Sequence, residues 1–257
     1  LPDGTEIPGT NFDYNYLQHR KVDVVSSALD FILPFEKYKI TAGAKVSFTN
    51  TRNGINYDTS DPTLVQDDYF RYKEQIYALY ADYSREFSER FSMQLGLRME
   101  HTRTTGISEA KDTEDKHDYT RLFPTVYLLY SPTDGHALNF SFSNRISRPS
   151  QNMVNPFPFY QNKYTYACGR EDLKPSYTYN AELGYTLKNN FNVSAYYSYS
   201  DDVFFQVVDL DAETNVTSFL WENFMKTHAF GLNNSYTFRT KWLQAYAQHG
   251  VSYRRTT

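Results

Sequence analysis

The sequence has little cysteine and no long apolar run. Cys168 is its only cysteine in 257 residues, which excludes an internal disulfide and a cysteine-rich zinc site. The longest unbroken apolar run extends only from Ile76 to Ala81, whereas a membrane-spanning helix needs about 20 residues, so no such helix is expected. The first residues, Leu1 to Gly4, do not resemble a signal peptide.

A large excess of charge of one sign is also absent. Lys and Arg total 26 and Asp and Glu total 30, giving a net charge of -4, which does not favour nucleic acid as a partner. Aromatic residues are abundant: 24 Tyr, 19 Phe and 2 Trp make up 18% of the chain. Because disordered chains are poor in aromatic residues, we expect a folded protein.

Apolar and polar residues alternate along most of the chain. The clearest segments are Tyr38–Thr49, Phe91–Thr102, Leu138–Arg145, Tyr177–Lys188 and Phe230–Arg239, and less regular ones lie near Val22–Leu33, Phe70–Tyr83, Leu122–Ser131, Phe191–Val208 and Leu243–Tyr253. A period of two indicates strands. No segment has a convincing helical period, and only residues 13–26 are ambiguous. We therefore predict an all-β fold: an antiparallel up-and-down meander of about ten long strands.

The length of the alternating segments distinguishes two classes of β protein. Strands of soluble proteins usually have about five or six residues, whereas the alternation here persists for about 12. Such a strand extends roughly 40 Å at about 3.3 Å per residue, and a tilt of about 45° projects it onto about 28 Å, close to the hydrocarbon thickness of a bilayer. The pattern therefore predicts part of a transmembrane β-barrel.

The connections between these segments alternate in length. The short ones are Pro34–Lys37, Ser84–Arg90, Pro132–His136, Lys188–Asn190 and Thr240–Lys241, and the longer polar ones are Asn50–Asp68, Thr104–Asp118, Ser147–Ser176 and Asp209–Phe219. Outer-membrane barrels have short periplasmic turns and long extracellular loops. Many aromatic residues flank the short turns, as in a periplasmic aromatic girdle: Phe31, Phe35, Tyr38, Tyr83, Phe87, Phe91, Tyr185, Phe191, Phe238 and Trp242.

The polar face of the strands would line the lumen of such a barrel. Its charged residues include Arg98, Glu100, Arg145 and Glu182, which we expect to face the lumen. Charged residues at membrane depth are candidates for function. For any single residue, however, a structural network between neighbouring strands is the favoured interpretation.

Signatures of enzymes and of bound cofactors are absent. No histidine has metal-ligand spacing, and there is no glycine-rich phosphate loop or Gly-x-Ser-x-Gly motif. Calcium could bind Asp112–Asp118 or Asp209–Glu213, but solvated loops are the favoured interpretation of both segments. Cys168 is better explained as an incidental thiol than as a reactive one. We therefore expect no enzyme, no catalytic residue, no cofactor and no metal site.

Several motifs, in their order and spacing, resemble one family. They are Phe70-x-Tyr72-x-Glu74-x-Ile76-x-Ala78-x-Tyr80, Gly96-Leu97-Arg98-x-Glu100 with Thr102, Leu122-Phe123-Pro124-Thr125-x-Tyr127, Ser143-Asn144-Arg145-Ile146-Ser147-Arg148-Pro149 with Asn155-Pro156-Phe157, and Gly169-Arg170-Glu171-Asp172-Leu173-Lys174-Pro175 before Glu182-Leu183-Gly184-Tyr185. Together these residues resemble the barrel of TonB-dependent outer-membrane receptors of the Bacteroidetes type. In the last motif, Arg170 and Glu171 stand where the family has Asn-Pro, and Ser176 replaces a Glu.

The resemblance implies a receptor in the outer membrane of a Gram-negative bacterium. Such a receptor takes up, with energy supplied through TonB, a ligand too large or too scarce for porins. Residues 1–257 would form a partial barrel domain, because about 22 strands close such a barrel and nothing here resembles a plug, a TonB-contacting segment or a terminal strand. The implied partners are outer-membrane lipid and the TonB complex through a plug outside this chain, and the family also allows a surface lipoprotein.

The resemblance leaves the ligand open among a siderophore, cobalamin, an oligosaccharide and a peptide. Aromatic residues of the longest loop are candidate ligand contacts, although packing among loops explains them equally well: Phe157, Phe159, Tyr160, Tyr164 and Tyr166. Two alternatives stay open. One is a complete small barrel without a plug, acting as a passive pore or adhesin. The other is a soluble, secreted β-sandwich that binds glycans, which the low mean hydropathy of -0.65 mildly favours.

Overall fold

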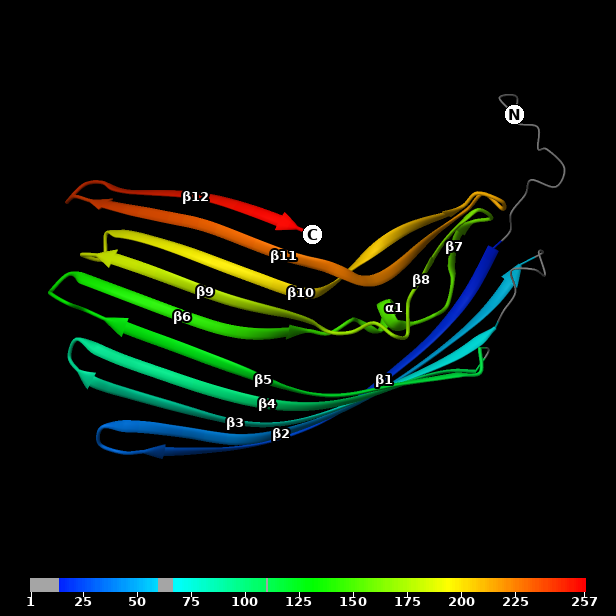
Figure 1. Cartoon of the computed structure of the whole chain (residues 1–257), viewed down its shortest axis with the longest axis horizontal. Helices are drawn as coiled ribbons and strands as arrows, with labels where there is room; N and C mark the ends of the chain where they lie inside the picture. Colours follow the sequence, from blue (N-terminus) through cyan, green and yellow to red (C-terminus); the bar gives the residue numbers. More distant parts are fainter. Residues whose placement is uncertain (1–13, 60–66, 110) are drawn as a thin grey trace, which may run out of the picture.

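A computed structural model describes residues 14–59, 67–109 and 111–257 and confirms the all-β meander. All of its strands lie in one sheet, which is curved (Figure 1). The long strands are β1 (Tyr14–Pro34), β2 (Tyr38–Thr59), β3 (Asp68–Ser88), β4 (Phe91–Ser108), β5 (Thr113–Tyr130), β6 (His136–Ser147), β9 (Ser176–Leu187), β10 (Phe191–Asp211), β11 (Val216–Arg239) and β12 (Gln244–Thr256). Two short strands, β7 (Phe159–Asn162) and β8 (Thr165–Cys168), and one short helix, α1 (Gln151–Val154), lie between β6 and β9.

The long strands follow one another in the order of the sequence, each antiparallel to the next. The order is β1-β2-β3-β4-β5-β6-β9-β10-β11, with β12 and β8 both paired to β11. Among the described residues the β8–β11 pairing is the only parallel one, and the sheet does not close on itself. A single sheet does not provide the two packed layers that a β-sandwich requires. No helix within the described ranges is long and apolar enough to cross a membrane.

All five predicted short turns are confirmed at one end of the sheet. They join β1 to β2, β3 to β4, β5 to β6, β9 to β10 and β11 to β12. Aromatic rings meet at this end: Phe35 stacks on Tyr38 with ring centroids 4.5 Å apart, and Phe87 and Phe91 have centroids 5.4 Å apart. The indole of Trp242 is 84% exposed. This arrangement is the one expected of rings that favour a membrane interface.

Three of the four predicted long loops are largely wrong, because the strands extend far into them, whereas Ser147–Ser176 is confirmed as the long connection between β6 and β9. The segment 50–59 is strand β2, whereas residues 60–66 of the same predicted loop lie outside the described residues. Most of Thr104–Asp118 belongs to β4 and β5, and only 109–112 separates these strands. Most of the segment 209–219 likewise belongs to β10 and β11, and only 212–215 separates these strands. The acidic segments proposed as solvated loops therefore lie mostly on strands, which reach 24 residues in β11.

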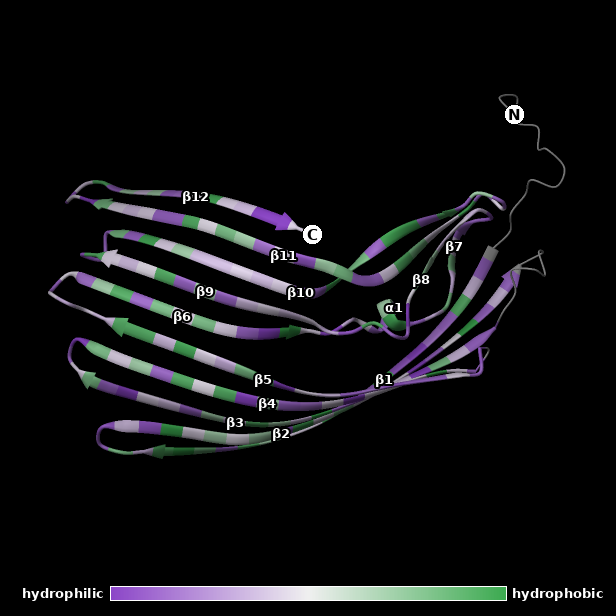
Figure 2. Cartoon of the chain, viewed as in Figure 1, coloured by the Kyte–Doolittle hydropathy of each residue, from purple (hydrophilic) through white to green (hydrophobic). Residues whose placement is uncertain are grey.

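The two faces of the sheet differ in composition, and hydrophobic and hydrophilic residues alternate along the strands (Figure 2). Residues 148–175 fold back over one face, because Phe157 contacts Phe70 of β3 with ring centroids 6.2 Å apart. We call these residues the strap, the covered face the inner face and the opposite face the outer face. Register pairs place an exposed apolar set on the outer face: Leu79, Leu95, Leu97, Met99, Leu122, Leu183, Phe230 and Leu232.

Candidate functional site

The strap contributes half of the apolar core. Val154, Phe157 and Leu173 pack against Ile55 and other residues of the inner face, and each of the four is at most 5% exposed. Phe70, on β3, is fully buried beneath them. Elsewhere the sheet is a single layer with little burial, so this cluster is the principal apolar contact that holds the strap on the sheet.

The sequence of the strap explains why it leaves the sheet. Pro149, Pro156 and Pro158 lack an N–H group and interrupt strand pairing. The two arms of the strap cross at Gly169, whose N–H donates to the carbonyl of Asn155 at 2.9 Å. A Cβ atom at Gly169 would overlap the carbonyl oxygens of residues 153 and 155, so this crossing requires glycine.

A hairpin within the strap reaches from β11 toward the first strands of the sheet. β8 pairs with β11, starting with Thr165 opposite Thr217. On its other side, Phe159 lies edge-on to Tyr16 of β1, with ring centroids 6.1 Å apart, and Tyr57 of β2 donates its hydroxyl to the carbonyl of Pro158 at 2.7 Å. The hairpin therefore connects opposite sides of the curved sheet at the end away from the short turns (Figure 1).

A buried ion-pair cluster anchors the start of the strap. The Arg148 guanidinium lies 3.2 Å from a carboxylate oxygen of Glu100 and 3.6 Å from one of Glu74, and it donates to Thr102 Oγ1 at 3.3 Å. The Glu100 side chain is 7% exposed and also accepts a hydrogen bond from Arg98 at 3.0 Å. One arginine of the strap thus neutralises carboxylates on two strands of the inner face.

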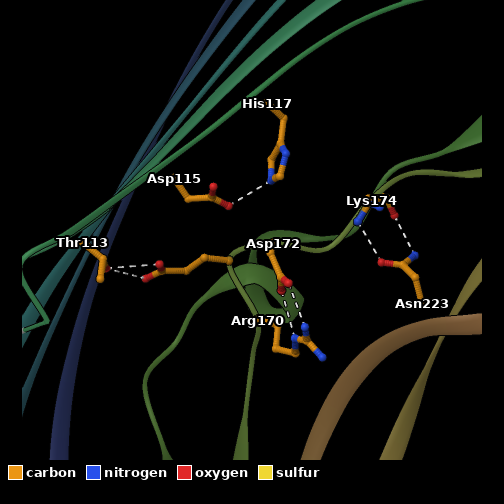
Figure 3. Close-up of polar contacts among 8 residues, drawn as sticks. Thr113, Asp115, His117, Arg170, Asp172, Lys174 and Asn223 are labelled. Atoms are coloured by element: carbon orange, nitrogen blue, oxygen red, sulfur yellow. Dashed lines mark hydrogen bonds and ion pairs between the residues drawn. The ribbon is translucent and has the colours of Figure 1, made fainter.

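A second, more exposed set of polar contacts holds the end of the strap (Figure 3). Arg170 donates to both carboxylate oxygens of Asp172, at 2.9 and 2.7 Å, and to Glu222 of β11 at 2.8 Å. Thr113 of β5 donates to Glu171 at 3.2 Å. Asn223 and the backbone of Lys174 exchange hydrogen bonds of 2.8 and 2.9 Å. These contacts join the strap to strands on both sides of it.

Two neighbouring acids of the strap have opposite pKa shifts. The Arg170 guanidinium, by its hydrogen bonds and charge, lowers the pKa of the Asp172 carboxyl below its usual 3.8. Burial raises the pKa of Glu171 above 4.5, against the lowering effect of its hydrogen bond from Thr113. The strap therefore carries one acid that is stabilised as an anion and one that is destabilised as an anion.

The five aromatic residues proposed as ligand contacts occupy different environments. Phe157 is 1% exposed and belongs to the core beneath the strap. The others lie on or beside the hairpin: Phe159 contacts Tyr16, Tyr160 and Tyr166 have ring centroids 5.4 Å apart, and Tyr164 is 54% exposed. The structure thus brings four of the five together on the hairpin.

The four charged residues expected to face the lumen share the inner face. The strand registers place their side chains on one side of the sheet. Arg98 lies opposite Phe123 of β5, and Glu182 lies opposite Ser141 of β6, which in turn lies opposite Tyr127 of β5. Arg145 follows Ser141 at an even spacing on β6 and lies on the same side. Among these four described residues, only Arg98 and Glu100 contact each other.

Residues that sequence reasoning missed carry much of this site. Arg148 and Glu74 were noted only within motifs, although they form the buried anchor of the strap. An arginine at the end of a polar strand face, directly before a proline, was the available signal.

Burial raises the pKa of the Cys168 thiol, whose sulfur donates to the carbonyl of Pro156 at 3.0 Å. Among the described residues no cluster of three or more His, Cys, Asp or Glu residues could hold a metal ion.

A comparison with protein families gives one match over nearly the whole chain. The profile described as outer membrane protein beta-barrel family matches residues 2–257. No curated protein matches the sequence.

Solved structures share the fold at low sequence identity. The copper transporter OprC has a TM-score of 0.66 at 12% identity, over 94% of this chain and 39% of OprC. The ferric citrate transporter FecA has 0.59 at 13%, over 95% of this chain and 37% of FecA. The ferric yersiniabactin uptake receptor FyuA from Yersinia pestis has 0.57 at 16%, over 95% and 37%. The chain therefore spans less than half the length of these proteins.

Proposed function

Because the chain belongs to the outer membrane protein β-barrel family, we propose that it forms part of the wall of a TonB-dependent receptor. Its location is the outer membrane of a Gram-negative bacterium. The strap supports the proposal most directly, since it lies across the inner face and would narrow the lumen of a closed barrel. The Bacteroidetes type of the family, the plug outside this chain and a surface lipoprotein stay predictions.

In this proposal, the aromatic hairpin of the strap contacts the ligand. Phe159, Tyr160, Tyr164 and Tyr166 offer ring faces and hydroxyl groups, a combination suited to amphipathic ligands. Phe157 supports them from the core. OprC is a copper transporter, FecA a ferric citrate transporter and FyuA a ferric yersiniabactin uptake receptor, so metal complexes are the first ligand class to test.

Arg98, Glu100, Arg145 and Glu182 line the lumen in the same proposal. The Arg98–Glu100 pair and Arg148 form a network that fixes the strap. This agrees with the interpretation of these charges as a structural network between neighbouring strands. The prediction that the protein is not an enzyme agrees with the solved structures, which are transporters and a receptor.

Uptake experiments on the intact protein that contains this chain test the proposal. Cells expressing it take up labelled ferric citrate, Cu²⁺ or ferric yersiniabactin, with and without a protonophore. Energised uptake of at least one probe should stop when the proton gradient collapses. The double substitution Tyr164→Ala and Tyr166→Ala should weaken binding about tenfold, whereas Trp242→Ala, at the opposite end, should leave it unchanged. Uptake that continues without the gradient would favour a passive pore.

A further inference from the structure

Strands β5 and β6 separate partway along the sheet and leave a fork in its wall. Their pairing ends at Thr125 opposite Ser143. Beyond that point, β5 continues along β4 as far as Thr113, and β6 continues along β9 as far as Ser147. The gap between the two strands widens toward the end that carries the strap (Figure 1).

Pro124 accounts for the position of the fork. The N–H of Ser131 donates to the carbonyl of Arg90, which directly precedes β4. Odd-numbered residues of β5 therefore direct their backbone groups toward β4, and even-numbered ones toward β6. Pro124 is therefore the next residue whose N–H would pair with β6, and proline has none. The register would place Asn144 opposite it. Instead, the Asn144 side chain donates to the carbonyl of Leu122 at 3.4 Å.

A cavity of about 480 Å³ occupies the fork. Its lining includes Arg98, Phe123 and Arg145 from the inner face. It also includes Leu97 and Ile146, which register pairs place on the outer face. The cavity borders the segment where β5 and β6 no longer pair, so it lies at the gap in the wall. Its volume lies within the range of small-molecule sites, roughly 300–1,000 Å³.

The cavity holds polar groups that lack protein partners. Asn144 is 9% exposed, and its Oδ1 atom is buried without a hydrogen bond. Such an atom requires a donor. Arg145 also lines the cavity, and among the described residues its guanidinium makes no hydrogen bond or ion pair, whereas Arg98 is engaged by Glu100. The fork therefore offers one cation to an anion and one buried acceptor to an N–H or O–H group.

The surface outside the fork is apolar. Leu97 is 50% exposed and Leu122 is 53% exposed on the outer face, at the level where the strands separate. In the outer membrane this surface contacts hydrocarbon chains. A ligand that enters the fork from outside would thus combine an apolar chain with a polar head.

We propose that the fork binds one lipid, whose phosphate pairs with Arg145 and whose neighbouring N–H or O–H group donates to Asn144 Oδ1. Its acyl chain lies outside the wall along Leu97 and Leu122. An aminophospholipid and a phosphorylated glucosamine lipid both have this combination of groups. Phosphatidylcholine has the phosphate and the chains but no donor, so it matches the site only in part.

Native mass spectrometry of the intact protein tests this site. The protein is exchanged into a neutral detergent with phosphatidylethanolamine, phosphatidylcholine or lipid A, and the number of retained lipid molecules is compared. One phosphatidylethanolamine or lipid A molecule should be retained at about tenfold lower lipid concentration than phosphatidylcholine. Whichever of these two lipids is retained at the lower concentration identifies the class of lipid that the fork binds. Equal retention of all three lipids would overturn the proposal.

Substitutions locate the binding. Arg145→Gln should weaken retention about tenfold, and Arg239→Gln, which removes an exposed inner-face arginine far from the fork, should not. Pro124→Ser restores the missing N–H, so β5–β6 pairing should extend and retention should be lost. Hydrogen exchange at residues 143–146 should then slow, and the heat-dependent mobility shift of a barrel confirms that the variants fold. Unchanged retention in both Arg145→Gln and Pro124→Ser would exclude the fork as the site.

Discussion

Removal of the Arg148 charge should release the strap from the inner face. In Arg148→Met, the aliphatic stem is kept while Glu74 and Glu100 lose their shared cation. Breaking a buried ion pair on one side costs about 3–5 kcal/mol, because a charge is left uncompensated. The side chains here are 22%, 18% and 7% exposed for Arg148, Glu74 and Glu100, which favours the lower end, about 3 kcal/mol. The open population of the strap should then rise on the order of 100-fold.

Limited proteolysis measures this population. Lys163 lies in the exposed turn between β7 and β8, and trypsin cleaves there when the flanking strands leave their pairing with β11, because a protease binds an extended segment. When opening and closing are fast, the cleavage rate follows the open fraction. Arg170→Met is the matched control, because its partners Asp172 and Glu222 are 58% and 40% exposed, and exposed pairs contribute only about 0–1 kcal/mol.

The outcome separates two explanations of strap closure. If Arg148→Met accelerates cleavage no more than Arg170→Met does, the buried ion pairs do not hold the strap and the reasoning is refuted. A further substitution, Glu74→Gln, should recover part of the closure in the Arg148→Met background, since Glu74 then carries the uncompensated charge, whereas Glu100 keeps its pair with Arg98. The same substitution in the native background should open the strap.

Three further predictions concern the same end of the sheet and its inner wall. Phe157→Ala should cost about 3–5 kcal/mol of strap closure, measured by the same cleavage assay, because it leaves a cavity in the core. Gly231→Ala should lower thermal stability by about 1–3 kcal/mol, because the added methyl group overlaps the Tyr196 ring. The stabilisation of the closed strap by Asp172 should be complete above the ordinary pKa of 3.8 and lost as the pH falls through the lower pKa that Arg170 imposes. Cleavage by an acid-active protease such as pepsin should therefore accelerate at low pH, and this acceleration should disappear in Asp172→Asn.

The alternation of apolar and polar residues predicts the strands but not their ends. Within the bilayer, one face meets hydrocarbon, so Leu95, Leu97 and Met99 stand out against their polar neighbours. Beyond the bilayer both faces meet water or the strap, and the alternation disappears although backbone pairing continues. Asp118, for example, accepts a hydrogen bond from Arg103 of the neighbouring strand at 2.9 Å, although polarity alone assigns Asp118 to a loop.

The strap site could be predicted only in part for a different reason. Its contacts join residues distant in the sequence, such as Arg148 with Glu74. Neither residue has a local pattern that names its partner. Phe157 lies among prolines, where an aromatic residue suits a loop surface, and only packing against Phe70 makes it core. The role of Pro124, in contrast, can be read from the sequence, because a proline inside an alternating segment indicates an interruption of strand pairing.

The parallel pairing of β8 with β11 has a consequence for the order of folding. Thr165 and Thr217 are separated in the sequence by β9 and β10, so their pairing closes a long loop. Contacts that close long loops form late, because the entropy of the intervening chain is lost before the contact is gained. Strands β1 to β6 can therefore assemble by local hairpins while the strap is still undocked. We therefore expect the hairpin to dock last, after a stage of folding in which the inner face is still uncovered.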